Sequence, residues 1–213
     1  MRAIFIDLET TGLDFDKHVV LDVGIVIADL NDISTTYEYT SCISCDAVDW
    51  LMSDEKILEI NGFNKENHWQ TAKKDHEVTK ELINFFKKYD VEKGKAFFIC
   101  NNSSLDRSFF LQLMSQELME ELNLPYHWLD LASMFWMKYY ACFHPIPSPH
   151  CIIPELCCEV SLSKDSITKH LGIPSENKPQ RALQGALHLL KCYMWLTGRS
   201  DATTKKLPLP IVT

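Results

Sequence analysis

Two carboxylates lie two residues apart inside an apolar segment near the amino terminus. Asp7 interrupts the apolar run of residues 3–8, Glu9 directly follows it, and a glycine turn comes next at Gly12. Alternate residues of a β-strand point to the same face, so a strand here would project both acids side by side. Like charges at that distance repel, and Mg²⁺, which prefers carboxylate oxygens, relieves the repulsion. The pattern predicts a strand carrying a metal site; a surface strand edge with two solvated acids is the alternative.

A third acid occurs in a matching context. Asp106 follows a strand-like segment over residues 96–99 and lies in the first turn of a predicted helix. The helix dipole favours an acid at that position, so an ordinary helix-start carboxylate is the alternative. Taken with the first pair, the third acid predicts one cluster of Asp7, Glu9 and Asp106, about a hundred residues apart in the chain.

The two acidic segments together resemble the DEDD exonuclease superfamily, which includes the proofreading subunit of bacterial DNA polymerase III, RNase T and oligoribonuclease. The family's first motif, D-x-E-T-T-G-L, matches residues 7–13, and its second, N-x-x-x-D-x-x-F-[FL], matches residues 102–110. Residues 58–63 and 124–130 also resemble the corresponding segments of family sequences, so the resemblance runs from about residue 3 to about residue 196. It implies an α/β fold of the ribonuclease H-like type, with three layers and a mixed five-stranded sheet flanked by helices, and 3′→5′ exonuclease activity.

The chain departs from the family at the third motif. In the histidine branch this motif is H-x-A-L-x-D-A, which supplies a general base and a last metal ligand. Gln180 stands at the His position and Gly185 at the Asp position. The tyrosine pattern, Y-x-x-x-D, has no match in the C-terminal helix. The resemblance therefore implies Asp7, Glu9 and Asp106 as metal ligands, with no general base beside them.

These two changes bear directly on activity. The resembling enzymes use two metal ions, one to activate water and one to stabilise the leaving 3′ oxygen. With three carboxylates, Mg²⁺ or Mn²⁺ is expected to bind weakly, and loss of a general base costs about 10²–10⁴-fold. Hydrolysis is expected to be weak or lost, unless His188 or Glu176 substitutes. An active enzyme with such a substitute, and a chain disabled by engineered changes at Gln180 and Gly185, are alternatives, so the question of enzyme or binding module stays open.

The resemblance also implies where substrate binds. Residues after the first Glu grip the terminal nucleotide in the family, and these roles fall on Thr10, Thr11 and Leu13, with Asn102 from the second motif. A turn with a buried leucine is the alternative for this segment. The expected ligand is the 3′ end of single-stranded DNA or RNA, or a nucleotide.

Composition limits the remaining possibilities. The chain has 213 residues, 46% hydrophobic, which suits one domain over residues 1–198 and a tail over residues 199–213. A net charge of −8 argues against a long basic surface that would bind duplex DNA, and it suits a small pocket for a strand end. No apolar run suits a membrane span or a signal peptide, so a cytoplasmic location with no membrane contact is expected. A homodimer, by analogy with oligoribonuclease-like relatives, or a protein partner is also possible.

The eight cysteines suggest reduced thiols rather than disulfides. Cys42 and Cys45 have the spacing of half a zinc knuckle, but no second half follows. The segment 142–158 is richer in Cys and His, and both a structural zinc site and ordinary loop packing remain open for it.

Hydrophobic periodicity predicts the elements. Strands are expected over residues 2–8, 19–29, 35–43, 96–100 and 127–129. Helices are expected over residues 53–60, 75–89, 163–170 and 180–196, with others starting near Asp106 and after Asp130 as N-cap, and an irregular loop over 141–160.

Overall fold

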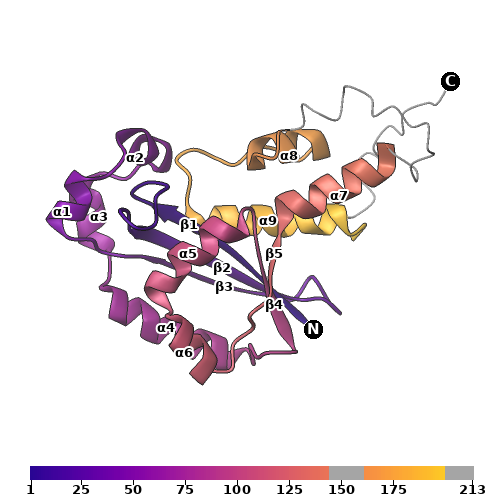
Figure 1. Ribbon diagram of the computed structural model, residues 1–213, viewed down its shortest axis with the longest axis horizontal. Coiled ribbons are helices and arrows are strands. Elements are labelled where there is room, and N and C mark those ends of the chain that lie inside the picture. The colour runs from indigo at the N-terminus through magenta and orange to yellow at the C-terminus, as the bar shows by residue number, and fades with distance from the viewer. Residues whose placement is uncertain (144–160, 200–213) are drawn as a thin grey trace.

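The fold is built on one mixed five-stranded sheet with strand order β3-β2-β1-β4-β5. A computed structural model describes residues 1–143 and 161–199 (Figure 1). The strands are β1 (Arg2–Thr10), β2 (Val20–Asp29), β3 (Thr36–Cys42), β4 (Ala96–Cys100) and β5 (Trp128–Asp130). β1 pairs antiparallel with β2, and β2 with β3, whereas β4 runs parallel to both β1 and β5. The predicted fold class is confirmed.

Helices cover both faces of the sheet, which makes three layers. They are α1 (Ala47–Leu51), α2 (Glu55–Asn61), α3 (Lys65–Thr71), α4 (Asp75–Lys88), α5 (Ser103–Leu113), α6 (Gln116–Glu121), α7 (Leu131–Phe143), α8 (Lys164–Leu171) and α9 (Ala182–Leu196). One apolar core packs α4, α5 and α6 against the alternate residues Ile4 and Ile6 of β1. The other packs α7, α8 and α9 against Ala3 and Phe5. The period-2 alternation of β1 thus divides its side chains between two cores.

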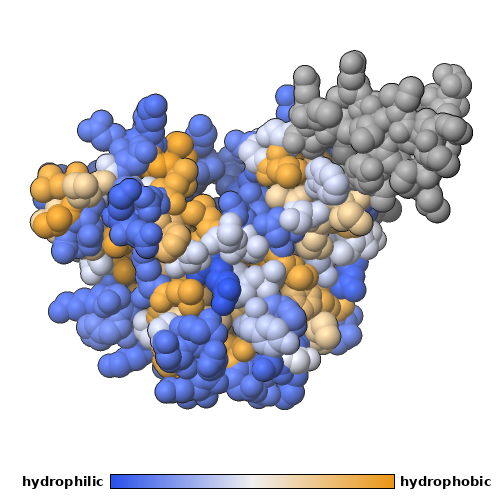
Figure 2. Space-filling view, viewed as in Figure 1, coloured by the Kyte–Doolittle hydropathy of each residue, from blue (hydrophilic) through white to orange (hydrophobic). Residues whose placement is uncertain are grey.

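Three short helices were not predicted from the sequence: α1, α3 and α6. Each has only five to seven residues, too few for a helical stripe of apolar side chains to be recognised. The side chain of Asp46 accepts hydrogen bonds at the start of α1, and that of Ser115 does so for α6. Val48 and Leu51 of α1 are exposed, and Figure 2 shows apolar side chains at this edge of the molecule.

The loop expected over residues 141–160 is wrong at its first three residues. Residues 141–143 continue α7, and residues 144–160 lie outside the described part of the chain, as does most of the possible zinc segment 142–158. Cys42 and Cys45 are free thiols. Among the described residues, no helix is long and apolar enough to cross a membrane.

Helix α9 begins directly on the sheet because β2 has a glycine at the point of contact. A Cβ atom on Gly24 would lie 2.1 Å from the backbone carbon of Ala182, so any larger residue would push the helix away. Gly24 is the register partner of Asp7 on β1. The close approach therefore places the first turns of α9 beside the acidic end of β1.

Candidate functional site

The acid pair of the first strand lies on the face of the sheet that α9 covers. Asp7 and Glu9 are each buried, and they alternate with Phe5 along β1. Asp22 of β2 is the register partner of Glu9 and is buried as well. Its Oδ2 accepts a hydrogen bond from the backbone N–H of Ala182, at 3.2 Å, and so orders the start of α9.

Asp106 reaches the same cleft from the first turn of α5. Its Oδ2 accepts a hydrogen bond from the backbone N–H of Asn102, at 3.1 Å, which fixes the carboxylate at the helix start. Asp106 and Glu9 line one cavity. The structure thus brings together the two acidic motifs that the sequence separates.

The acids of this cleft are crowded and poorly solvated. Burial, together with the nearby charge of Asp7, raises the pKa of Glu9 to about 8. Burial raises the pKa of Asp106 to about 7, with Asp7 again contributing. Burial likewise raises the pKa of Asp7, although Lys164 opposes this. A cleft of this kind requires a positive charge to hold its carboxylates ionised.

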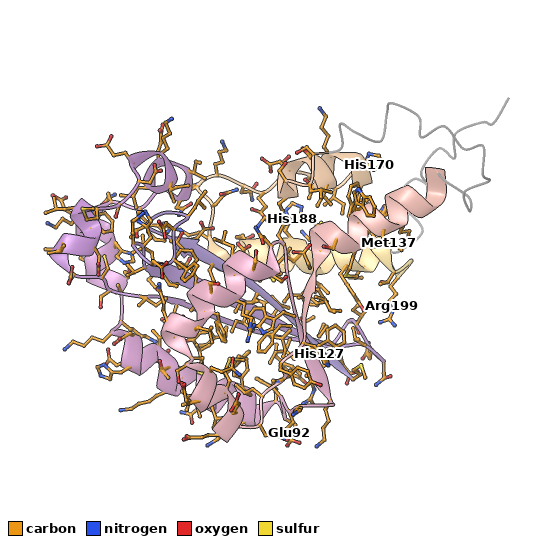
Figure 3. All side chains as sticks on the ribbon, in the orientation of Figure 1. Glu92, His127, Met137, His170, His188 and Arg199 are labelled. Carbon is orange, nitrogen blue, oxygen red and sulfur yellow. The ribbon has the colours of Figure 1, made fainter. Side chains whose placement is uncertain are left out.

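That positive charge comes from Lys164, the first residue of α8. Its Nζ lies 3.0 Å from Oδ1 of Asp7 and 2.8 Å from Oε1 of Glu176. Burial would lower the pKa of Lys164, but the charges of the two acids outweigh burial and raise it, so the side chain is an ammonium cation. The same oxygen of Glu176 lies 3.3 Å from Nδ1 of His188. Figure 3 labels His188 on α9, next to α8.

Gly185 lies against this ion pair. A Cβ atom on Gly185 would be 1.9 Å from Oδ2 of Asp7 and 3.0 Å from Nζ of Lys164. The space that an aspartate side chain would need at this position is therefore filled by Asp7 and Lys164. Gln180, at the other altered position, lines the cavity, and its Nε2 lies 3.4 Å from Oε2 of Glu176.

This arrangement does not fit a pair of divalent ions. Such an ion needs carboxylate oxygens at about 2.0–2.6 Å, and the ammonium of Lys164 already occupies the side of Asp7 that faces α8. Gly185 supplies no ligand. Within residues 1–143 and 161–199, no three His, Cys, Asp or Glu side chains are gathered closely enough to hold one metal ion. The motif carboxylates are brought near one another, but one of them, Asp7, is paired with a lysine.

A cavity of about 200 Å³ opens beside the acids. Its lining combines polar and apolar side chains: Leu8, Glu9, Thr10, Leu13, Ile57, Ile60, Asn61, Leu105, Asp106, Phe109 and Gln180. Leu13 is 64% exposed although it is a leucine, so the alternative of a buried leucine in this turn is wrong. An exposed leucine at a cavity edge provides an apolar surface for a flat ring.

The other three residues assigned to substrate have local structural roles. Thr10 lines the cavity, and its hydroxyl donates to the backbone oxygen of Gly12 at 2.6 Å. Thr11 is fully buried, and its hydroxyl accepts from the backbone N–H of Val19 at 3.0 Å. Asn102 is the N-cap residue of α5 and does not line the cavity. The structure thus brings Thr10 and Leu13 to the cavity and leaves the side chain of Thr11 away from it.

Two residues of the cleft were missed by the sequence analysis. Asp22 is an acid inside the apolar strand β2, a signal of the same kind as Asp7, and could have been found. Lys164 lies in a polar segment between Ser163 and Asp165, where a lysine is normally a solvated charge. Nothing in that local pattern indicates its contact with Asp7, 157 residues earlier.

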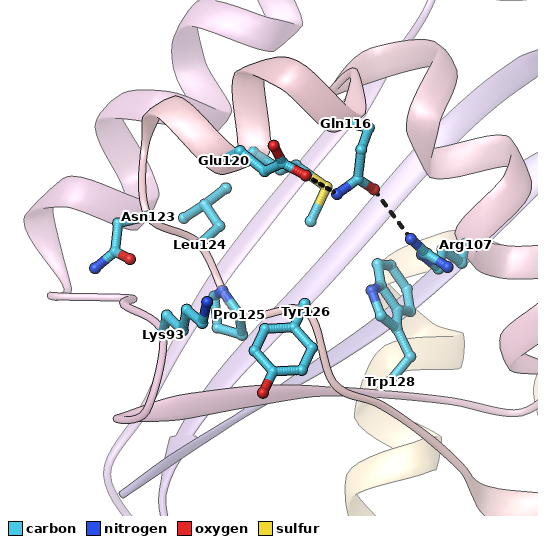
Figure 4. A pocket seen from close by; sticks show the side chains of 10 residues that line it. Lys93, Arg107, Gln116, Glu120, Asn123, Leu124, Pro125, Tyr126 and Trp128 are labelled. Atoms are coloured by element: carbon cyan, nitrogen blue, oxygen red, sulfur yellow. Dashed lines mark hydrogen bonds between the residues drawn. The ribbon is translucent and has the colours of Figure 1, made fainter.

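A larger cavity, of about 450 Å³, lies at the β5 edge and away from the acids (Figure 4). Arg107, Gln116 and Glu120 line one side of it, joined by hydrogen bonds of 3.0 and 2.8 Å. Tyr126 and Trp128 line the other side. None of the three motif carboxylates lines it.

Comparison with known proteins supports the fold. No family model matches the chain. The "Probable oligoribonuclease" of Schizosaccharomyces pombe is 24% identical over 140 residues, which cover 62% of this chain and 52% of that protein. The chain therefore spans about half the length of this curated relative.

Solved exonucleases and nucleases have the same architecture. Cell-death related nuclease 4 superposes with a TM-score of 0.64 at 14% identity, over 92% of this chain and 64% of that one. E. coli Exonuclease I in complex with a dT13 oligonucleotide superposes with a TM-score of 0.64 at 14% identity, over 93% of this chain and 41% of that one. The nuclease domain of 3′hExo, a DEDDh family member bound to rAMP, superposes with a TM-score of 0.59 at 16% identity, over 92% of both chains.

These likenesses define a class of fold, the ribonuclease H-like three-layer fold with a mixed five-stranded sheet. Within that class, the structural neighbours of the chain include DEDDh 3′→5′ exonucleases, as the two acidic motifs predicted.

Proposed function

We propose that this protein binds the 3′ end of single-stranded DNA or RNA in the cleft of Asp7, Glu9 and Asp106, and that phosphodiester hydrolysis there is weak or lost. The observation that carries the proposal is the cavity beside these acids. It combines an exposed apolar surface at Leu13 with polar groups from β1 and α5. Such a cavity matches a nucleoside, which has a flat base and a hydrogen-bonding sugar.

The proposed loss of hydrolysis rests on the chemistry of two positions. Gln180 lines the cavity, but its amide cannot accept a proton from water near neutral pH. Gly185 has no ligand atom, and the ammonium of Lys164 is already paired with Oδ1 of Asp7. Any binding of Mg²⁺ or Mn²⁺ is accordingly proposed to be weak.

The alternative of a fully active enzyme has less support. The two candidate substitutes, His188 and Glu176, are paired with each other, and Glu176 is also paired with Lys164. Neither lines the cavity. An engineered origin of Gln180 and Gly185 is likewise not favoured, because Lys164 fits the space that Gly185 leaves. A single domain over residues 1–198, a homodimer and a cytosolic location stay predictions.

Binding to short fluorescent single strands tests the proposal. We expect anisotropy to report binding of a single strand but not of a blunt duplex of the same sequence. Leu13→Ser should weaken binding about tenfold or more, since a buried leucine contributes about 1.5–3 kcal/mol. Leu51→Ser is the matched control, because Leu51 is 79% exposed and lies on α1, outside the cavity. Equal affinity for duplex and single strand, or equal effects of both substitutions, would contradict the proposal.

A further inference from the structure

The carboxylate cleft contains its own cation. Lys164 pairs with Asp7 at 3.0 Å and with Glu176 at 2.8 Å, and the side chains of all three are at most 18% exposed. Two acids from distant parts of the chain thus share one ammonium group. An ammonium between two carboxylates provides the positive charge that a metal ion would otherwise supply to such a site.

Lys164 occupies a helix position that is unfavourable for a lysine, so its place is determined by the contacts with Asp7 and Glu176. Lys164 is the first residue of α8, directly after the N-cap Ser163. A positive charge in the first turn of a helix is unfavourable, because the N–H groups there are themselves the positive end of the helix dipole. The two carboxylates outweigh that cost.

Gly185 and Lys164 fit each other. A Cβ atom on Gly185 would lie 3.0 Å from Nζ of Lys164, and a longer acidic side chain would extend further toward the ion pair. Glycine therefore leaves room for Asp7 and the lysine to meet. The absence of an acidic side chain at position 185 therefore goes together with the pairing of Lys164 and Asp7.

We propose that the Lys164 ammonium takes the place of a divalent ion in this cleft and excludes such an ion from Asp7. The inference does not depend on strand binding, because it concerns only which cation the acids hold. An Mn²⁺ ion at Asp7 would have to displace Lys164 and leave Glu176, which is 5% exposed, without its ammonium partner. Repulsion between the two cations opposes joint occupancy.

Calorimetric titration of the EDTA-treated, dialysed protein with Mn²⁺ tests this inference. We expect Lys164→Gln to bind Mn²⁺ at least about tenfold more tightly than the wild-type protein, because the competing charge is removed while a polar side chain only one atom shorter is retained. Lys164→Arg, which keeps the charge, should remain as weak as wild type. Lys169→Gln, an exposed lysine on the same helix, is the control and should change nothing. Equal affinity of wild type and Lys164→Gln would overturn the inference.

A second measurement needs no variant and covers a failure of Lys164→Gln to fold. Mn²⁺ broadens nuclear magnetic resonance signals of nearby atoms. Addition of Mn²⁺ to the wild-type protein should leave the backbone signal of Gly185, which lies beside Asp7, as sharp as that of a buried residue in the opposite core, such as Phe86. Selective broadening at Gly185 would place an ion in the cleft and refute the inference, whatever the strand-binding experiment shows.

Discussion

A Cβ atom added to Gly185 would lie 1.9 Å from Oδ2 of Asp7. Real atoms do not approach so closely, so a side chain at position 185 and the present position of Asp7 exclude each other. Asp7 cannot move freely, because its Oδ1 is paired with Lys164 at 3.0 Å. This relationship makes several variants informative.

Gly185→Ala is expected to bring no gain in stability. Alanine is about 1 kcal/mol better than glycine in a helix interior, but forcing a methyl group against a packed site costs about 1–3 kcal/mol. Urea unfolding should therefore show a stability equal to or below that of wild type, with Asp7 displaced. Gln184→Ala is the control on the exposed side of α9, and it should gain a few tenths of a kcal/mol. A clear gain for Gly185→Ala would show that the cleft has spare room.

Gly24→Ala is expected to be more damaging than Gly185→Ala. The added Cβ atom would meet the backbone of Ala182 and Leu183 at 2.1 Å, and a helix backbone cannot rotate aside as a side chain can. The start of α9 would have to leave β2, and its hydrogen bond from the Ala182 N–H to Asp22 would be lost. We expect a loss of about 3 kcal/mol or more in unfolding free energy, or no folded protein. If both alanine variants unfold at the same urea concentration, this ranking is wrong.

Restoring the third motif alone should not restore hydrolysis. The sequence favours Gln180→His with Gly185→Asp as a repair, but the new aspartate would enter the space of Asp7 and Lys164. We expect the double variant to remain inert on a short single strand, and the triple variant that adds Lys164→Gln to release nucleoside monophosphates in Mn²⁺. Adding Asp7→Asn to the triple variant is the control and should abolish any gain. Activity of the double variant equal to that of the triple one would show that Lys164 moves aside without difficulty.

The fold was largely predictable because β1, β2 and α9 have strong apolar patterns and the acidic motifs have specific spacing. The convergence of Asp106 with Glu9 followed from the same motifs. What the sequence did not reveal was the cation. An ion pair between Lys164 and Asp7 depends on tertiary structure, because no periodicity relates residues 157 positions apart. Glu176 was singled out, but as a ligand for a metal rather than a partner for a lysine.

Asp22 offers a test of the buried charge in the cleft. Burial raises its pKa from the ordinary 3.8 to about 6 in the folded protein, with Asp7 adding to the shift. Between these two values the folded state holds a proton that the unfolded state has lost, so the contribution of Asp22 to stability falls as the pH rises from about 4 to about 6 and stays low above that. Replacement by asparagine removes the ionisation and retains an oxygen for the Ala182 N–H.

We therefore expect Asp22→Asn to stabilise the protein by about 1–3 kcal/mol at pH 8, since each unit of pKa shift corresponds to about 1.4 kcal/mol. The gain should shrink steadily as the pH falls from 6 toward 4 and vanish only below about pH 3, where Asp22 is protonated in both states. Urea unfolding across this pH range measures the difference from wild type. Asp16→Asn, at an exposed aspartate, is the control and should show no such dependence. A gain that is constant with pH would show that Asp22 is not a buried charge at neutral pH, and that its effect arises from packing instead.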